Sequence, residues 1–342
     1  MTGYYTGPDP ALVNRRPRRR LPSASRSQVT TWVAGGVVVL LLVLPLLIDQ
    51  LALRRTASLI VLMLAVLGVV VATGYAGLIS LGHGAFVGVG AFAMASYLDL
   101  AALPFPLALA ATFGTCWLAG FLLGLPALRV RGIYLALLTL GLGVVFPSLA
   151  KQFPTFTGGV TGRPVDATME APAWLGDEHT ITWRYFFCLA VCALLFVVTH
   201  RVLRTRAGRA MQAVRDDETA AASFGVDLVR TKTGAFAFSA ALAGTAGALQ
   251  AVLFPFVSHE QFTVFLSFRL YAAAVIGGVG YVIGAVYGVV ALILVPLVNG
   301  LLGVLENDVL VFGLGLIVLT FVSPDGLAGV IRRWEQGGED GA

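Results

Sequence analysis

Long uninterrupted apolar runs are the feature that most constrains how this chain can fold. The first run covers Val33–Leu53, and similar runs recur along the sequence with mostly short polar connections between them. A helix needs about 20 apolar residues to cross a bilayer, whereas a membrane-spanning β-strand alternates apolar and polar residues over about 10 positions. The runs do not alternate. They therefore predict transmembrane helices, and the chain is expected to be an all-α polytopic membrane protein.

About ten such runs can be delimited, which would place roughly 200 residues inside the membrane. They are approximately Val33–Leu53, Thr56–Thr73, Ser80–Leu98, Phe105–Pro126, Gly132–Lys151, Trp183–Leu203, Thr233–Phe254, Leu266–Val282, Ile283–Val304 and Asp308–Val322. The composition agrees, because 58% of the 342 residues are apolar and 12% are charged, against about 45–50% and 25% in soluble domains. A soluble enzyme, a disulfide scaffold and a disordered chain are thereby excluded.

The positions of the basic residues indicate an orientation with both termini in the cytoplasm (N-in and C-in). In this orientation the cytoplasmic segments hold 17 of the 23 Lys and Arg residues, in agreement with the positive-inside rule. Arg54 and Arg55 then lie on the outer side and are the weak point of the assignment. The first run is longer than the 7–15 apolar residues of a secretory signal and lacks a cleavage site, so it is expected to remain as a span.

The predicted spans divide the chain into a central membrane domain, residues 32–323, and two tails. Residues 1–31 contain six arginines directly before the first span, which favours a disordered cytoplasmic tail over a nucleic-acid-binding arm. Residues 324–342 are the expected cytoplasmic C-terminal tail. Two connections are long enough to have roles of their own: an external loop, residues 152–182, and a cytoplasmic loop, residues 204–231.

The predicted spans carry no acidic or basic residue near their middle. Charged residues inside a bilayer mark ion and proton pathways, and charged rings select ions in channels, so a proton-coupled transporter and such a channel are disfavoured. Cys188 and Cys192 are one helical turn apart but have no other metal-binding residue nearby, so they are interpreted as packing residues. No metal site is predicted, and the sequence has no Walker A loop that would bind ATP.

Glycine is abundant in residues 74–90 and again in residues 277–288. Small residues four positions apart allow the backbones of two membrane helices to approach closely. Four glycines with this spacing are therefore predicted to pack helices: Gly84 with Gly88, and Gly284 with Gly288.

Ser80 and His83 are candidates for lining a solute path. Ser80 can cap a helix that begins at Leu81, and a helix N-terminus inside a transporter can face an anionic group. The alternative is that Ser80 serves only as a cap and that His83 packs against, or hydrogen-bonds to, a neighbouring helix. Three further polar residues in apolar helices either face the path or bond a backbone carbonyl: Thr139, Gln250 and Asn299.

Within the cytoplasmic loop, residues 208–225 are predicted to form one short helix that ends at Gly225. Its apolar residues form only a partial stripe, interrupted by charges, so it has little surface to bury in its own chain. A mixed face of this kind is typical of a helix that docks into a groove of a soluble partner. Three successive acids disfavour a position on an anionic membrane surface. The predicted docking residues are Met211, Val214, Arg215, Asp216, Asp217, Glu218, Ala221 and Gly225.

Several segments, taken in order, resemble the LivM-type permease subunits of bacterial branched-chain amino-acid ABC importers. They are Tyr75–Phe86, Arg131–Leu140, Ala213–Gly225, Phe238–Leu249, Val275–Gly280 and Ser323–Gly329. The resemblance covers about residues 44–329 and leaves out the arginine-rich residues 1–27. In the loop motif, Glu218 lies seven residues before Gly225, as in the branched-chain subfamily, but the acidic pair Asp216-Asp217 replaces an amide-containing pair.

The resemblance implies an ABC importer permease fold in a protein that catalyses no covalent reaction and holds no cofactor. It also implies partners in the bacterial inner membrane: a second homologous permease subunit, two cytoplasmic ATPase subunits that use ATP and Mg²⁺, and an extracytoplasmic solute-binding protein. The expected solute is leucine, isoleucine or valine, with urea, amides or another small polar solute as the alternative. The alternative from another class is an ion-coupled secondary transporter.

Overall fold

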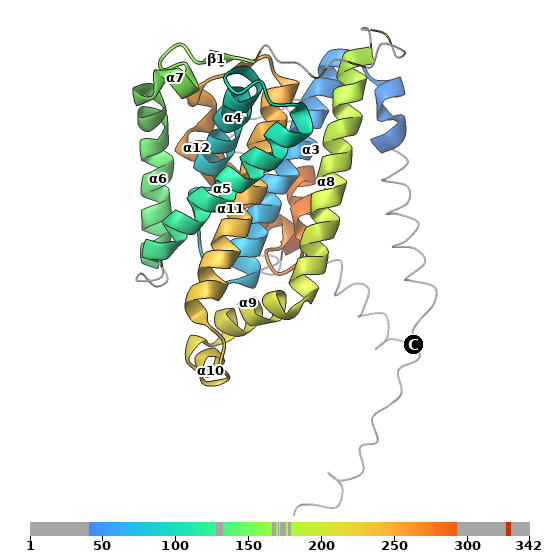
Figure 1. The fold of residues 1–342 in the computed structure, drawn as a ribbon. Coiled ribbons are helices and arrows are strands. Elements are labelled where there is room, and N and C mark those ends of the chain that lie inside the picture. The colour runs from blue at the N-terminus through green and yellow to red at the C-terminus, as the bar shows by residue number, and fades with distance from the viewer. Residues whose placement is uncertain are drawn as a thin grey trace, which may run out of the picture. The chain divides into compact units, whose positions relative to one another are not determined.

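The computed structural model describes residues 41–127, 133–165, 169, 171, 176, 179–292 and 326–329. The chain divides into two units, Met1–Val43 and Leu44–Ala342, and the following description concerns the second. In it, helices of very different length form a bundle, with short elements at both ends (Figure 1). The elements are α3 (Gln50–Val69), the π-helix η1 (Val70–Tyr75), α4 (His83–Asp99), α5 (Phe105–Ala127), α6 (Ile133–Gln152), α7 (Pro154–Thr157), β1 (Arg163–Pro164), α8 (Thr180–Arg204), α9 (Arg206–Asp216), α10 (Glu218–Ser223), α11 (Leu228–Leu253), β2 (Phe256–Val257), the 3₁₀-helix η3 (His259–Phe262) and α12 (Val264–Gly277).

Five helical segments in the described part of the chain are long and apolar enough to cross a membrane: α3 with η1, α5, α6, α8 and α11. Each coincides with one of the predicted spans, and α4 coincides with a sixth. Of three other predicted spans, Val33–Leu53 is described only from residue 41, Ile283–Val304 is described only as far as residue 292, and Asp308–Val322 lies wholly outside the described residues. The total of about ten spans and the N-in, C-in orientation therefore stay predictions.

The boundary predicted between the first two spans, at Arg54 and Arg55, is wrong. Residues 41–47 are helical, the chain bends at Ile48, and α3 then runs through both arginines without interruption. Leu53 on the same turn is 1% exposed in the core, so burial of the apolar face keeps this turn helical. The long arginine stems can meanwhile extend toward the membrane surface.

The span predicted at Leu266–Val282 is also corrected. The helix α12 has 14 residues and ends at Gly277, which gives a length of about 21 Å, short of the roughly 30 Å hydrocarbon core. Gly278 stops the helix because its φ is +107°, and a turn follows before helical residues resume at Gly284. The glycines therefore break the span inside the predicted range.

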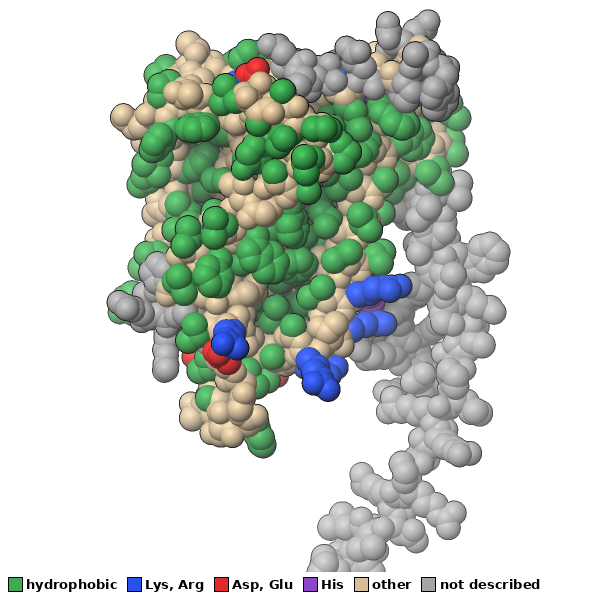
Figure 2. All heavy atoms as spheres, in the orientation of Figure 1, with side chains coloured by type: hydrophobic (Ala, Val, Ile, Leu, Met, Phe, Trp, Pro, Cys, Tyr) green, Lys and Arg blue, Asp and Glu red, His purple; other side chains and the backbone are tan. Residues whose placement is uncertain are grey.

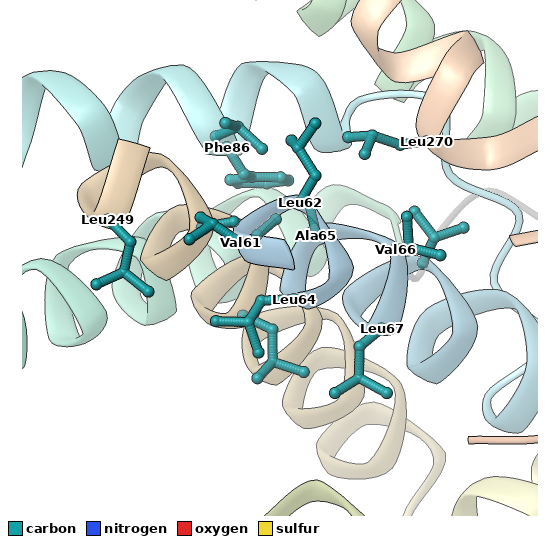
Figure 3. Packing of buried hydrophobic residues seen from close by; sticks show 14 of the residues in the cluster. Val61, Leu62, Leu64, Ala65, Val66, Leu67, Phe86, Leu249 and Leu270 are labelled. Atoms are coloured by element: carbon teal, nitrogen blue, oxygen red, sulfur yellow. The ribbon is translucent and has the colours of Figure 1, made fainter. Parts of the chain in front are cut away.

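The helix α11 forms the core of this unit and packs against α3, α4 and α5. Its most apolar stretch is 94% buried within the chain, against 22% for α8. Small residues allow this burial. A Cβ at Gly90 of α4 would overlap the carbonyl of Gly244 in α11, and a Cβ at Gly247 would overlap the Val87 carbonyl. Leucine, valine and phenylalanine side chains fill the remaining space between the helices (Figure 3).

The outer helices leave a broad apolar surface exposed, which covers the middle of the face drawn in Figure 2. On α6 it includes Tyr134, Leu137 and Val144, all more than half exposed. An apolar surface of this kind is stable when lipid tails or another membrane subunit cover it.

Candidate functional site

The segment between η1 and α4, residues 76–82, is a non-helical stretch that is mostly buried in the bundle. Irregular backbone at membrane depth is tolerated only where other groups satisfy its hydrogen bonds. Here the Leu81 N–H donates to Thr139 Oγ1 of α6 over 2.9 Å, and the Gly84 N–H donates to Ser267 Oγ of α12 over 2.9 Å. Side chains from two distant helices thus hold the start of α4 in place.

Ser80 does not cap α4 as predicted. The helix begins at His83, two residues later than expected, with Gly82 at the N-cap position and no side-chain cap there. Ser80 Oγ accepts only a long bond of 3.5 Å from the Gly82 N–H. Ser267, which bonds the first turn instead, was missed because it lies 183 residues away in the sequence and no local pattern connects it to α4.

His83 lies inside the bundle with 1% of its surface exposed. Its ring meets the Phe86 ring edge-on at 6.2 Å, and the backbone of Gly68 on α3 is close by. Within the described part of the chain, neither ring nitrogen has a hydrogen-bond partner. Both Ser80 and His83 are closed off from solvent in this conformation, so their role in a solute path stays a prediction.

The other predicted path residues lie at two separate places. Thr139 is buried, donates to backbone carbonyls of its own helix and accepts from Leu81. Gln250 lines a pocket of about 220 Å³, together with Phe254, Phe256 and Gln261 among others. On α11, Gln250 comes 11 residues after Ser239, whose carbonyl lies beside Gly68 and His83. The two positions are therefore about 16 Å apart along the helix. Asn299 lies outside the described residues.

Each of the four predicted packing glycines lies against a neighbouring segment. A Cβ at Gly84 would lie 2.7 Å from Ser267 Oγ, and one at Gly88 would overlap the Phe146 ring of α6. At Gly284 and Gly288, an added Cβ would overlap the carbonyl oxygens of Gly278 and Ala273, respectively. The glycines thus permit close approach of helices and of the turn after α12.

The two breaks in the membrane helices lie side by side. A Cβ at Gly74 in η1 would overlap the carbonyl oxygen of Val279, which lies in the turn after α12. The end of η1 and the turn that follows α12 therefore lie against each other, although they are about 200 residues apart in the sequence.

The loop predicted to be cytoplasmic contains two helices rather than the single helix predicted, and they meet at Asp217. The extended backbone of Asp217 ends α9, and its carboxylate accepts from the N–H groups of Thr219 and Ala220 at 2.8 and 3.0 Å. Asp is among the strongest N-cap residues, so the side chain starts a new helix at this point. The predicted end at Gly225 is confirmed, because Gly225 has φ +82° and follows the last residues of α10 in a left-handed C-cap.

The prediction that this loop has little apolar surface to bury in its own chain is wrong. Met211, Val214 and Ala221 are 6%, 3% and 3% exposed, because α9 folds back against α8, α11 and η1. The most exposed large apolar side chain of the loop is Phe224, at the end of α10, which is 89% exposed. Any partner would therefore meet the tip of the loop rather than the stripe along α9.

Arg215 connects the loop to the first break. Its Nη1 donates to the Gly74 carbonyl over 2.6 Å, and its Cγ lies 2.9 Å from where a Cβ of Gly77 would be. Gly77 has φ +69°, a conformation that glycine adopts without strain. The guanidinium also pairs with Asp216 at 2.9 Å. Arg215 forms no ion pair with Glu218, which lies three residues later in the loop.

Glu218 instead pairs with Lys232 at the start of α11, at 2.6 Å. The loop is thus fastened to the bundle at two points, Arg215 to η1 and Glu218 to α11. Lys232, Gly74 and Gly77 were missed by sequence reasoning, because only the fold brings them to the loop.

At the opposite end of the bundle, the predicted external loop is also fastened down (Figure 1). The short strand β1 pairs antiparallel with β2, with Arg163 opposite Val257. Arg163 is 7% exposed; it forms an ion pair with Asp99 at the end of α4 and donates to the carbonyls of Thr155 and Phe156. Arg163 therefore ties the loop to α4.

The chain shows clear similarity to one family of known proteins. The family model described as the permease component of branched-chain amino acid transport systems matches residues 51–320. The chain is 35% identical over 288 residues to the high-affinity branched-chain amino acid transport system permease protein LivM of Escherichia coli, a match that covers 78% of this chain and 67% of that protein. The protein of the same name from Salmonella typhimurium is 36% identical over 292 residues, with the same coverage.

A more distant relative comes from an archaeon. The probable branched-chain amino acid transport permease protein LivM of Methanocaldococcus jannaschii is 23% identical over 225 residues, which cover 61% of this chain and 64% of that protein. No solved structure matches the chain at a significant level.

Proposed function

This chain belongs to the family of branched-chain amino-acid transport permeases, and from that premise we propose that it forms half of the membrane path of an ATP-driven importer. It is a multi-pass membrane protein and a transporter subunit. In the proposal it lies in a bacterial inner membrane beside a second, homologous permease subunit. Two ATPase subunits hold ATP and Mg²⁺, and an extracytoplasmic binding protein delivers the solute.

The observation that carries the proposal is the construction of the loop formed by α9 and α10. A loop that receives force from a partner needs an exposed contact and firm connections to the part that moves. The exposed contact is the tip at Phe224, which is 89% exposed. The connections are the hydrogen bond from Arg215 to Gly74 and the ion pair from Glu218 to Lys232.

The breaks at the ends of η1 and α12 are the proposed moving parts. Hinges are short segments that absorb changes in φ and ψ, and Gly77 and Gly278 both have positive φ values. Arg215 holds the first break, and the second lies against it at Gly74 and Val279. Movement of the loop would therefore shift both breaks together and change access to the buried region around His83.

The proposed solute is leucine, isoleucine or valine, since the relatives' names refer to branched-chain amino acids. Urea, amides or another small polar solute are the alternative within the same type of importer. The charged residues argue against an ion-coupled secondary transporter. In the described part of the chain, the buried Arg184 and Lys232 lie near the ends of spans, and the buried Arg163 lies outside them. Proton and ion pathways usually require charged residues deeper in the membrane.

The proposal is tested by reconstituting the chain with its partner subunits in liposomes and measuring uptake of labelled leucine and labelled urea. Uptake of leucine is expected to require ATP and to persist when the proton gradient is collapsed at constant ATP. The matched control uses ATPase subunits that bind but do not hydrolyse ATP, and it should abolish uptake. Uptake driven by an imposed pH gradient without ATP would establish the secondary transporter instead, and transport of urea alone would correct the solute.

A further inference from the structure

The corner between α8 and α9 concentrates positive charge without any acid. The ten residues from His200 to Arg209 contain four arginines and one histidine and no Asp or Glu. All five side chains are exposed. We call these residues the basic corner; they are His200, Arg201, Arg204, Arg206 and Arg209. Figure 2 shows basic side chains at this end of the molecule, below the broad apolar surface.

The basic corner lies where a membrane span ends. The helix α8 is a candidate span that runs to Arg204, and α9 begins two residues later and crosses the end of the bundle (Figure 1). Side chains in the last turn of a span lie at the level of the lipid head groups. The arginines of the basic corner are therefore at the depth of the lipid phosphates, whichever side of the membrane this end faces.

The geometry of the basic corner is fixed by close contacts. A Cβ at Gly208 would overlap the Leu203 carbonyl, so α9 starts directly against the end of α8. Leu203 and Met211 are buried beneath, and Arg209 Nη1 donates to the Arg204 carbonyl over 3.2 Å. The corner is thus a preformed surface from which the charged groups project outward.

The charges of the basic corner are not neutralised within the described part of the chain. The ion pairs found there use Arg163, Arg215, Arg230 and Lys232, none of which belongs to the corner. The acids closest in sequence are already engaged: Asp216 with Arg215, Asp217 as the cap of α10, and Glu218 with Lys232.

From this surface we infer a binding site for the phosphate groups of anionic phospholipids. Clusters of four or more basic residues directly after a membrane span attract anionic lipids, and the arginine guanidinium matches a phosphate with two parallel hydrogen bonds. The three successive acids of the loop would repel an anionic leaflet if they lay beside the basic corner. They lie instead where α9 ends and α10 begins, at the other end of α9 from the basic corner. The inference does not depend on the proposed transport function.

The test is native mass spectrometry of the full chain, titrated with phosphatidylglycerol and with phosphatidylcholine. Wild-type protein is expected to retain phosphatidylglycerol preferentially. Replacing the four arginines of the basic corner by glutamine should reduce this preference by about tenfold or more, since the attractions of several basic residues to an anionic leaflet add together. The matched control is Arg230→Gln, an exposed arginine elsewhere on the same loop that pairs with Asp227, and it should retain the preference.

Two further arms make the result decisive. Replacing the same four arginines by lysine keeps the charge and should keep a preference for phosphatidylglycerol. Inorganic phosphate at millimolar concentration should not displace the lipid, because the site faces the membrane. An unchanged lipid preference in the four-glutamine variant would overturn the inference. So would displacement of the lipid by inorganic phosphate alone.

Discussion

His83 lies in the buried core with no hydrogen-bond partner for either ring nitrogen in the described part of the chain. A buried polar group without a partner costs about 1–3 kcal/mol, so a purely structural position would be served better by an apolar side chain. Its ring meets the buried Phe86 ring edge-on and lies beside Gly68 of α3. The residue fits a role in which another conformation gives its ring a partner, such as a solute.

We therefore expect His83→Leu to separate stability from transport. Removal of the unpartnered ring should leave the free energy of unfolding in detergent unchanged or raise it by about 1 kcal/mol. Solute uptake should fall. The measurement is the melting temperature together with uptake in reconstituted liposomes. Normal uptake in the variant would show that His83 only packs against its neighbours, which the sequence also allowed.

Gly90 tests the close packing of α4 on α11. Gly90→Ala places a Cβ against the Gly244 carbonyl, and backbone atoms cannot rotate out of the way, so a loss of about 1–3 kcal/mol in stability is expected. The matched control is Gly114→Ala in α5, where an added Cβ would meet nothing within 4 Å. The check is thermal unfolding of both variants in the same detergent. Equal stabilities would contradict the described contact between the two helices.

At the scale of elements, the sequence predicted well those helices whose length and apolarity decide their position. The spans at α5, α6 and α8 were found because about 20 apolar residues in a row have few alternatives to crossing a bilayer. The ends of α4 and α12 were misplaced because they depend on tertiary contacts. Ser267 bonds the start of α4 from another helix, and Gly278 stops α12 inside an apolar run.

The loop of α9 and α10 shows the same limit in another form. The spacing of its apolar residues correctly predicted helical structure. Two consequences of the fold, however, were not visible in the sequence. Asp217 acts as a cap rather than as a surface charge, and α9 buries its apolar residues against the bundle. A charged run between apolar residues could equally belong to one exposed helix, so only the tertiary structure identified the break.

The cap at Asp217 leads to a prediction for α10. Asp217→Ala should remove about 1 kcal/mol of helix stabilisation. Because α10 has only six residues, it should then fray and bind the ATPase subunits less well. The measurement is the amount of ATPase that co-purifies with the permease. The matched control is Asp227→Ala, which removes a similar cap from the 26-residue α11. If both changes reduced the co-purified ATPase equally, or if neither reduced it, α10 would not be the docking element.

At the scale of the whole molecule, the described chain holds its connecting segments at both ends of the bundle. Arg163 ties the segment that contains β1 to α4, and the loop of α9 and α10 is tied to η1 and α11 at the other end. Between these ends lie two breaks in the membrane helices that touch each other. This arrangement suits a permease in which a partner at one end changes access to a solute path inside.

The central claim is that Arg215 transmits the movement of the ATPase subunits to the break at Gly74, and the most direct test is the number of ATP molecules hydrolysed per solute transported. For Arg215→Ala in reconstituted liposomes, the ATPase subunits should still co-purify, and this ratio should rise because a charged hydrogen bond of about 1.5–3 kcal/mol is lost. Arg215→Lys, which keeps a charged donor, should partly restore the ratio, and the control Arg230→Ala should leave it unchanged. A normal ratio in Arg215→Ala, with transport intact, would contradict the account.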